Sequence, residues 1–362
     1  MLERAPALEE VGAGLQLSPN AVKPLLALGL GEALARAGRE PAVMEMRMGL
    51  SGRRVFSLEQ ARAMRRRYGA PYLLLHRADL VGLLAAALEG RAPGALRLGT
   101  EVLSHDGAAA RMATGEVVAG DLVVGADGLH SVIRTAMLGP ERPTFTGNVA
   151  YRCLAPAGPD LPDGPCIWAG PRAHGVTYPL RGGEVVNFVG IVEEDEIAEE
   201  TWSAETSREE TLARFAGWDA RLQRLIETAP RHLKWGLYTR PPLPRWAEGP
   251  VALLGDAAHP MLPSLAQGAG MAIEDAWVLA GLCDAQPMTA ALARYEAARK
   301  PRASRVQAVA ARNVRLFHHR GLLGKAFAYG PIMAAGLAAP SVIRARQDWV
   351  YREDVTEMDF GV

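Results

Sequence analysis

The stretch 251–275, VALLGDAAHPMLPSLAQGAGMAIED, constrains the fold of this chain more than any other part of it. The apolar run 251–254 predicts a buried strand, which ends at Gly255-Asp256. A loop with two prolines follows, and Gly268-Ala269-Gly270 then begins a helix with apolar residues at helical spacing. Open α/β sheets bind ligands at the carboxyl ends of their strands. The stretch therefore predicts an α/β fold with a ligand site after this strand.

The residue types in this stretch fit such a site. The Asp256 carboxylate can accept hydrogen bonds from ribose or ribityl hydroxyls, and the two glycines let a ligand ring approach the backbone closely. The start of the helix offers unpaired N–H groups and partial positive charge to an anionic group. The alternative is an ordinary strand, loop and helix in which Asp256 serves as a cap.

Other motifs along the chain occur in the order of one known family. HRADL stands at 76–80, and DLVVGADGLHSVIR stands at 121–134. Together with 251–275 they resemble the HRADL, DG and GD motifs of the flavin-dependent aromatic hydroxylases of the para-hydroxybenzoate hydroxylase type. The stretch 147–152 and Tyr178-Pro179 resemble the salicylate and 6-hydroxynicotinate hydroxylase branch of that family. The resemblance covers nearly the whole chain.

The resemblance implies a fold and a reaction. The fold is an FAD-binding Rossmann-like α/β domain with an inserted antiparallel-sheet substrate domain and C-terminal helices. The reaction is a monooxygenation that uses FAD, NADH or NADPH, and dioxygen. A flavin hydroperoxide hydroxylates a small aromatic acid or phenol, while the protein orients and shields the cofactor.

The resemblance also assigns cofactor contacts in the first half of the chain. Glu3, followed by Arg4, matches the acid that binds the adenosine ribose at the end of the second strand. Arg77 of HRADL matches an arginine that contacts the cofactor, and a guanidinium suits phosphate oxygens. Asp127-Gly128 matches the DG pair that touches FAD and helps to admit nicotinamide. The alternatives are surface positions for Glu3 and Arg77 and a turn position for Asp127.

The remaining candidate cofactor residues lie in the stretch 251–275 and, for Arg134, in the stretch 121–134. Asp256 would bind a ribityl or ribose hydroxyl, and Gly268-Ala269-Gly270 would face the N1–C2=O edge of the flavin. Reduced flavin is anionic there, and a helix N-terminus stabilises a nearby charge by roughly 0.3–1 kcal/mol. Arg134 could serve a phosphate of NAD(P)H, or it could be a surface residue.

His174 and Tyr178 are the candidate catalytic residues. They lie four residues apart in a predicted strand, so both side chains are expected on one face. The 6-hydroxynicotinate hydroxylases have the same spacing at their substrate site, which implies that the pair binds a phenolate or carboxylate and moves its proton. Gln16 stands where that branch has a histidine. The alternative is a packed tyrosine with a surface histidine, and His259 is interpreted as a structural loop residue.

One part of the family pattern does not occur in this sequence. No GxGxxG turn precedes Glu3, and Gly12-Ala13-Gly14 follows it and lacks the third glycine. Such a turn holds the FAD pyrophosphate on a helix N-terminus. We therefore expect a family member without its first strand, phosphate loop and first helix, explained by a misplaced start site or a truncated gene. We also expect this form to bind FAD weakly.

Changes in the frequency of Pro and Gly and in the type of predicted element divide the sequence into four segments. We expect the first part of the FAD-binding domain at 1–140, the substrate domain at 141–245, a return segment of the FAD-binding domain at 246–285 and a helical region at 286–362. Strands are predicted at 148–154, 174–180 and 184–192, and helices from Ser18-Pro19 and over 77–89. A helical pattern over 289–325 is expected to be interrupted at Pro301.

Composition limits the partners. The chain has 362 residues, with 40 basic and 40 acidic residues, which argues against nucleic acid as a partner. Three widely spaced cysteines predict neither disulfides nor a metal site and fit the cytoplasm. The apolar stretch 327–343 is too interrupted for a membrane span. A homodimer is left open.

Two rival functions remain at this point. One is a flavin oxidoreductase of the same fold that acts on a non-aromatic substrate. The other is a non-enzymatic remnant that cannot hold FAD. Flavin absorbance of the purified protein would distinguish the remnant from the enzymes.

Overall fold

The computed structural model describes residues 1–8, 14–158, 160–195, 204–318, 329–332, 334, 336 and 339–361. Its strands are β1 (Gly14–Leu17), β2 (Val43–Met48), β3 (Arg54–Glu59), β4 (Leu73–His76), β5 (Val102–Asp106), β6 (Ala109–Met112), β7 (Val117–Ala119), β8 (Val123–Gly125), β9 (Thr144–Pro156), β10 (Cys166–Gly170), β11 (Ala173–Leu180), β12 (Val185–Glu193), β13 (Ala204–Thr206), β14 (His232–Thr239), β15 (Ala247–Glu248) and β16 (Val251–Leu253). Its helices are α1 (Pro19–Ala27), α2 (Gly31–Ala37), α3 (Ala61–Tyr68), α4 (Arg77–Arg91), α5 (Val132–Leu138), α6 (Arg208–Arg214), α7 (Ala220–Thr228), α8 (Gly268–Ala285), α9 (Met288–Phe317), α11 (Pro340–Ala345) and α12 (Asp348–Tyr351). The 3₁₀ helices are η1 (Arg181–Gly183), η2 (Gly255–Ala257), η3 (Pro263–Leu265) and η4 (Val355–Glu357).

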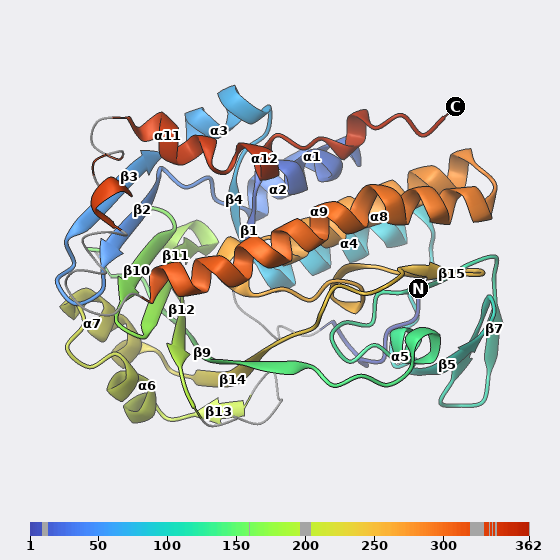
Figure 1. Cartoon of the computed structure of the whole chain (residues 1–362), viewed down its shortest axis with the longest axis horizontal. Coiled ribbons are helices and arrows are strands. Elements are labelled where there is room, and N and C mark those ends of the chain that lie inside the picture. Colours follow the sequence, from blue (N-terminus) through green and yellow to red (C-terminus); the bar gives the residue numbers. More distant parts are fainter. Residues whose placement is uncertain are drawn as a thin grey trace.

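An eight-stranded sheet, in the order β13-β14-β9-β12-β11-β10-β2-β3, forms one side of the molecule (Figure 1). Its neighbours pair antiparallel except for β10 and β2, which run parallel. The predicted strands at 148–154, 174–180 and 184–192 are confirmed as parts of β9, β11 and β12. Two strands from the part of the chain before residue 140, β2 and β3, extend this sheet.

The two faces of the large sheet bury different cores, because side chains alternate along each strand. On one face, Val149, Tyr151 and Cys153 of β9 pack with α6 and α7. On the other face, Ala150 packs with Trp235 of β14 and with residues of α9. We call this second face the inner face of the sheet, because it looks toward the rest of the molecule.

The rest of the molecule contains three small sheets and the helices between them. β8 and β16 run parallel, with Leu253 opposite Gly125, so their carboxyl ends lie at the same edge. β5, β6 and β7 follow one another as two antiparallel hairpins. The predicted helix over 77–89 is confirmed as α4, and the helix start at Ser18-Pro19 is confirmed in α1. The mixed α/β fold with a large sheet and C-terminal helices is therefore confirmed.

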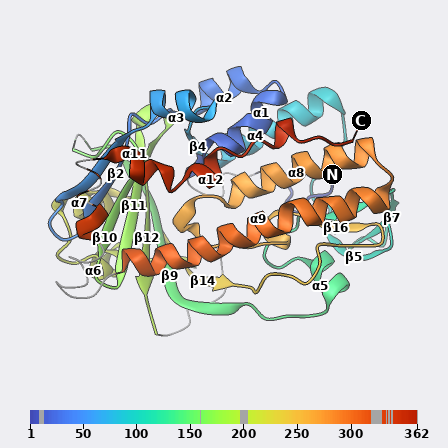
Figure 2. The same ribbon diagram turned by 45° about the horizontal axis from the view of Figure 1, so that its top comes forward.

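Two long helices, α8 and α9, run side by side across the molecule (Figure 2). The predicted helix start at Gly268 is confirmed. The predicted interruption at Pro301 is wrong, because α9 continues through that residue. A proline inside a helix costs about 3 kcal/mol. Residues of α9 that precede and follow Pro301 in the sequence, including Tyr295, Ala303 and Val306, are buried. Their packing offsets that cost.

Candidate functional site

The two motif turns predicted from the sequence lie next to each other. Asp127-Gly128 follows β8 and Gly255-Asp256 follows β16, and these strands are parallel neighbours. Both aspartates therefore stand at the carboxyl edge of one small sheet, where open α/β sheets bind ligands. The sequence predicted a strand that ends at Gly255-Asp256, but it did not predict the parallel pairing that brings Asp127-Gly128 beside it.

Asp256 is the acidic group of this edge that has no partner. Its side chain is exposed, and no hydrogen bond or ion pair reaches its carboxylate within the described ranges. The surrounding protein nevertheless desolvates the carboxylate and raises its pKa, against the opposing charges of His259 and Arg77. We use the word cleft for the region that Asp256, Arg77 and the inner face of the large sheet border, because the charges of Asp256, Arg77 and Arg152 act on one another there. The alternative, an aspartate engaged as a cap, is not what the structure contains.

Arg77 faces the same cleft from α4. It begins that helix directly after His76, whose ring accepts a hydrogen bond from the N–H of Ala78 at 3.3 Å. The guanidinium is exposed, and its charge acts on both Asp256 and Arg152. The positive charge of Arg77 therefore lies between the Gly255-Asp256 turn and the inner face of the large sheet.

No side chain among the described residues accepts a hydrogen bond from the first amides of α8. Met271 donates the first helical hydrogen bond, to the carbonyl of Gln267 at 2.8 Å, so the amides of Gly268-Ala269-Gly270 precede it. Gln267 forms no cap bond, and the first turn carries no acidic residue. Gly270 also has a packing role, because a Cβ there would lie 3.3 Å from Cβ of Ala21.

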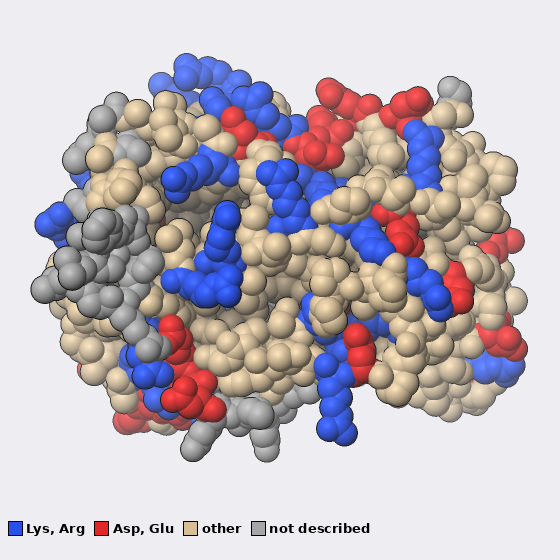
Figure 3. All heavy atoms as spheres, in the orientation of Figure 1, with Lys and Arg blue, Asp and Glu red and all other residues tan. Residues whose placement is uncertain are grey.

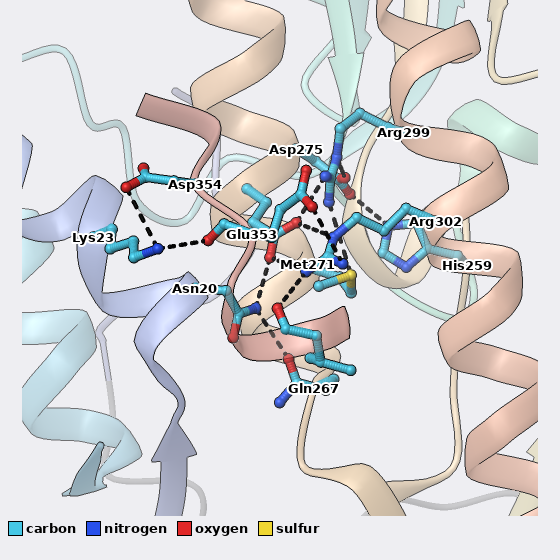
Figure 4. A network of polar contacts seen from close by, with 12 residues as sticks. Asn20, Lys23, His259, Gln267, Met271, Asp275, Arg299, Arg302, Glu353 and Asp354 are labelled. Atoms are coloured by element: carbon cyan, nitrogen blue, oxygen red, sulfur yellow. Dashed lines mark hydrogen bonds and ion pairs between the residues drawn. The ribbon is translucent and has the colours of Figure 1, made fainter. Parts of the chain in front are cut away.

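A buried polar network holds α8 behind this N-terminus (Figure 4). Asp275 accepts hydrogen bonds from the N–H of Gly255 at 3.2 Å, from Nε of Arg299 at 2.8 Å and from Nε2 of His259. Burial alone would raise the pKa of Asp275, but His259 and Arg299 hold it below its ordinary value. The interpretation of His259 as a structural loop residue agrees with these contacts.

Glu274 continues the network on the neighbouring position of α8. Its carboxylate accepts from Arg299 at 2.7 Å, from Arg302 at 2.8 Å and from the amide of Asn20 at 2.6 Å. Arg302 also donates to the carbonyls of Trp349 and Val350 at 3.0 and 2.9 Å. The network therefore joins α8 to α9, α1 and α12, and with Asp275 it fixes the turn that presents Asp256.

Asp127 has local partners in this structure. Its carboxylate accepts from the N–H groups of Val132 and Ile133 at 2.8 and 3.2 Å and from the hydroxyl of Ser131. These bonds cap α5, as the turn alternative expected. The contact of Asp127-Gly128 with a cofactor stays a prediction.

Arg134 joins the two motif turns. It is only 2% exposed and donates to the carbonyl of Ala257 at 3.0 Å and to that of Leu129. The surface alternative for Arg134 is therefore wrong, because the carbonyls of these buried turns require a donor.

Glu3 and Arg4 lie on a short extended segment. Leu2 forms a parallel bridge with Arg97, and the carboxylate of Glu3 accepts a hydrogen bond from the N–H of Ala5 at 2.8 Å. Arg4 is exposed. Their contacts with an adenosine ribose stay predictions. Gly12 and Ala13, which precede Gly14 in the stretch that lacks the third glycine, lie outside the described residues.

Tyr178 lies on the inner face of the sheet, at the cleft. Burial raises its pKa to about 12, while Arg152 and a hydrogen bond with Gln16 act in the opposite direction. Gln16 also accepts a hydrogen bond from the hydroxyl of Tyr72 at 2.7 Å. A Cβ on Gly14 would lie 2.2 Å from the Tyr178 ring, so this glycine is required for the ring position.

His174 occupies the same strand and face, as expected, but it has different partners. Its Nδ1 lies 2.7 Å from Nε2 of His318, whose Nδ1 lies 3.2 Å from a carboxylate oxygen of Glu193. Burial and His318 lower the pKa of His174 well below its ordinary value. The surface alternative is wrong, because His174 is 1% exposed. No hydrogen bond joins His174 to Tyr178 in the described part of the chain.

Sequence reasoning missed polar residues that long-range packing brings to the site. Asn187 is fully buried and accepts a hydrogen bond from the N–H of Gly14 at 3.2 Å. An asparagine inside the apolar run 185–192, VVNFVGIV, was the available signal. The sequence shows Arg152 only as the last residue of the stretch 147–152, and it gives Asp275 no local signal.

Neither a metal cluster nor a membrane-spanning helix emerges from the ranges that the structure describes. No group of three or more metal-ligating side chains occurs in these ranges. No helix there is both long and apolar enough to cross a bilayer. All three cysteines are free, and Cys153 and Cys166 are buried.

Comparisons with known proteins identify the family of this chain. The model of a family described as "FAD binding domain" matches residues 1–310. The chain is 39% identical over 315 residues to 3-amino-4-hydroxybenzoate 2-monooxygenase of Streptomyces platensis, covering 84% of this chain and 78% of that protein. It is 38% identical over 322 residues to 6-hydroxynicotinate 3-monooxygenase of Bordetella bronchiseptica, covering 85% and 83%. A salicylate hydroxylase solved as a substrate complex superposes with a TM-score of 0.79 at 26% identity, covering 95% of this chain and 89% of that one.

Proposed function

The chain belongs to this family of FAD-binding proteins, and we propose that it is a flavin-dependent monooxygenase that hydroxylates a small aromatic acid or phenol. The proposed electron donor is NADH or NADPH. Relatives named for 3-amino-4-hydroxybenzoate and 6-hydroxynicotinate, and a structural neighbour named for salicylate, support an aromatic substrate. The common element of these names is a hydroxylated six-membered ring with a carboxylate.

The unpartnered carboxylate of Asp256, beside the N-terminus of α8, is the observation that carries this proposal. FAD carries hydrogen-bond donors and acceptors that would pair with these groups of the protein. A ribityl or ribose hydroxyl would donate to Asp256, and the anionic edge of reduced flavin would accept from the amides of Gly268-Ala269-Gly270. Arg77 would bind pyrophosphate oxygens through its forked donors. These residues therefore fit the flavin and ribityl part of the cofactor, whereas the GxGxxG turn that would hold the pyrophosphate does not occur in the sequence, so weak FAD binding stays the expectation.

When bound, FAD would take a hydride from NAD(P)H and then use dioxygen to place one oxygen atom on the ring, releasing the other as water. The protein would bind, orient and shield the reactants. Tyr178 carries its proton at physiological pH, as a tyrosine ordinarily does, and burial raises its pKa further, so we assign it the role of donor to a substrate oxygen. His174 is neutral and buried against His318, so we assign it a positioning role on the same face.

The rate of NAD(P)H oxidation tests the proposal. Purified protein supplied with FAD should oxidise NADH or NADPH faster when a hydroxylated benzoate or nicotinate is added, and mass spectrometry should find a product heavier by one oxygen atom. Oxidation that stays unchanged across a panel of such acids and phenols would favour a non-aromatic substrate. We also expect the protein to work in the cytoplasm, where free thiols stay reduced.

A further inference from the structure

Arg152 is a partly buried cation that pairs with no acidic group among the described residues, and we propose that its guanidinium binds the carboxylate of the aromatic substrate. The inference rests on the proposed function and narrows its substrate class from aromatic compounds in general to aromatic acids. It starts from the place of Arg152 in the large sheet.

The register of the sheet places Arg152 on the inner face. Arg152 of β9 stands opposite Val189 of β12, which in turn stands opposite Val176 of β11. Tyr178 is two residues beyond Val176 and therefore shares this face. The neighbouring Tyr151 points to the other side, where its hydroxyl contacts Glu210 at 3.1 Å. Arg152 and Tyr178 therefore look into the same cleft.

Arg152 differs from the surface arginines of this protein. Figure 3 shows basic side chains that reach solvent, for example over α3, where Arg65 and Arg67 pair with Glu40 and Asp348. Nε of Arg152 is buried and has no hydrogen-bond partner, and no acidic group pairs with this guanidinium in the described ranges.

The charges that act on Arg152 leave its positive charge uncompensated. Burial lowers its pKa, Tyr178 opposes that shift, and the charge of Arg77 adds to it. A charge held in protein without a partner costs free energy, which an anionic ligand can offset. The cleft therefore carries two cations, Arg77 and Arg152, and each is available to a different anionic group.

The surroundings of Arg152 favour a planar anion attached to a ring. Its Cζ lies 5.2 Å from the centre of the Trp235 ring, so one face of the guanidinium packs on this ring. The N–H groups at the edge of the guanidinium can then donate to a ligand. Nδ2 of Asn187 is a second buried donor without a partner on this face. Val176, which is partly exposed and stands opposite the buried Val189, supplies apolar surface beside them. A carboxylate matches the forked donors, and an aromatic ring would cover Val176.

An anion could also come from a cofactor phosphate, so the test separates the two sources. The full chain, loaded with FAD, is compared as parent, Arg152→Met, Arg152→Lys and Arg231→Met. Arg231 is a matched control, because it is an exposed arginine of the same sheet region that pairs with Glu205 at 2.8 Å. The probes are the three hydroxybenzoates and the corresponding neutral hydroxybenzamides, measured by titration calorimetry, together with FAD affinity.

We expect the parent to bind at least one acid about tenfold to a hundredfold more tightly than its amide, as for a hydrogen bond to a charged group. Arg152→Met should remove this preference and leave amide binding within about twofold, Arg152→Lys should keep part of it, and the control should keep all of it. Arg152→Met should also unfold at a higher temperature than the parent when no ligand is present, because an unpaired charge has been removed.

Three results would overturn the inference. One is a parent that shows no preference for acids, or binds none of them. Another is an Arg152→Met variant that loses FAD affinity and keeps its preference for acids, which would assign Arg152 to a cofactor phosphate. The third is a lower unfolding temperature with unchanged ligand binding, which would make Arg152 structural. None of these depends on turnover, so failure of the proposed reaction is detected separately by NAD(P)H oxidation.

Discussion

Replacing Asp275 by asparagine tests whether the buried network holds the cofactor turn in place. Asp275 is completely buried and receives three donors, from Gly255, His259 and Arg299. Breaking a buried ion pair costs about 3–5 kcal/mol. Arg299 keeps Glu274 at 2.7 Å, so we expect the lower end, about 3 kcal/mol. With an unfolding entropy of about 2.1 cal/mol/K per residue, that loss lowers the unfolding temperature by roughly 4 °C in a chain of 362 residues.

The pH dependence of this loss has a definite sign. The folded-state pKa of Asp275 lies below its ordinary value, so its stabilisation is present above a pH of about 3.9 and is lost as the pH falls through the folded-state pKa. The stability difference between parent and Asp275→Asn should therefore be constant near neutral pH and shrink below pH 4.

Urea and thermal unfolding followed by circular dichroism measure this difference in stability. Titration with FAD measures the cofactor affinity, which depends on the position of the Gly255-Asp256 turn. Asp106→Asn is the control, because Asp106 is an exposed aspartate that pairs with Arg111 at 3.3 Å and should contribute at most about 1 kcal/mol. We also expect Asp275→Asn to weaken FAD, because the N–H of Gly255 loses its carboxylate acceptor. Equal stability of the two variants at pH 7 would refute this account of the network.

Three further predictions concern the cleft itself. Asp256→Asn should weaken FAD binding about tenfold to a hundredfold without lowering the unfolding temperature of the FAD-free protein, since its carboxylate has no partner there; a lower temperature with unchanged affinity would make it structural. Gly14→Ala should raise KM for the aromatic substrate, because the new Cβ would displace the Tyr178 ring, and an unchanged KM in steady-state kinetics would count against that ring position. The parent should lose stability as the pH falls below about 6.5, because the pKa of His174 is lowered in the folded state, and urea titrations should show a smaller loss for His174→Gln.

Local sequence signals predicted the elements around the site correctly. The end of a strand at Gly255-Asp256 and the start of a helix at Gly268 follow from the change of apolar spacing from strand to helix. Alternation also placed His174 and Tyr178 on one face. Pro301 misled the prediction, because helix propensity is local and the packing of α9 on both sides of the proline is not.

The partners of these residues could not be predicted in the same way. Asp275 follows Glu274 in an ordinary helical sequence, and only the fold brings Arg299 and His259 to it. Nothing in the local sequence distinguishes Arg134 from other arginines of short helices. Its hydrogen bond to the carbonyl of Ala257 depends on the position of that turn in the fold. The pairing of His174 with His318 joins positions 144 residues apart along the chain. Contacts of this length depend on topology, which residue spacing alone does not specify.

The alternation of the large sheet has a practical consequence for engineering. Because side chains alternate along each strand, randomising every second position of β9, β11 and β12 would change only the inner face, with its candidate ligand groups and its own packing, and would spare the core against α6 and α7. A small combinatorial library would contain positions Leu154, Val176, Asn187 and Val189. Keeping Arg152 in one half of the library and replacing it in the other would sort the selected clones by whether they accept acids or neutral rings.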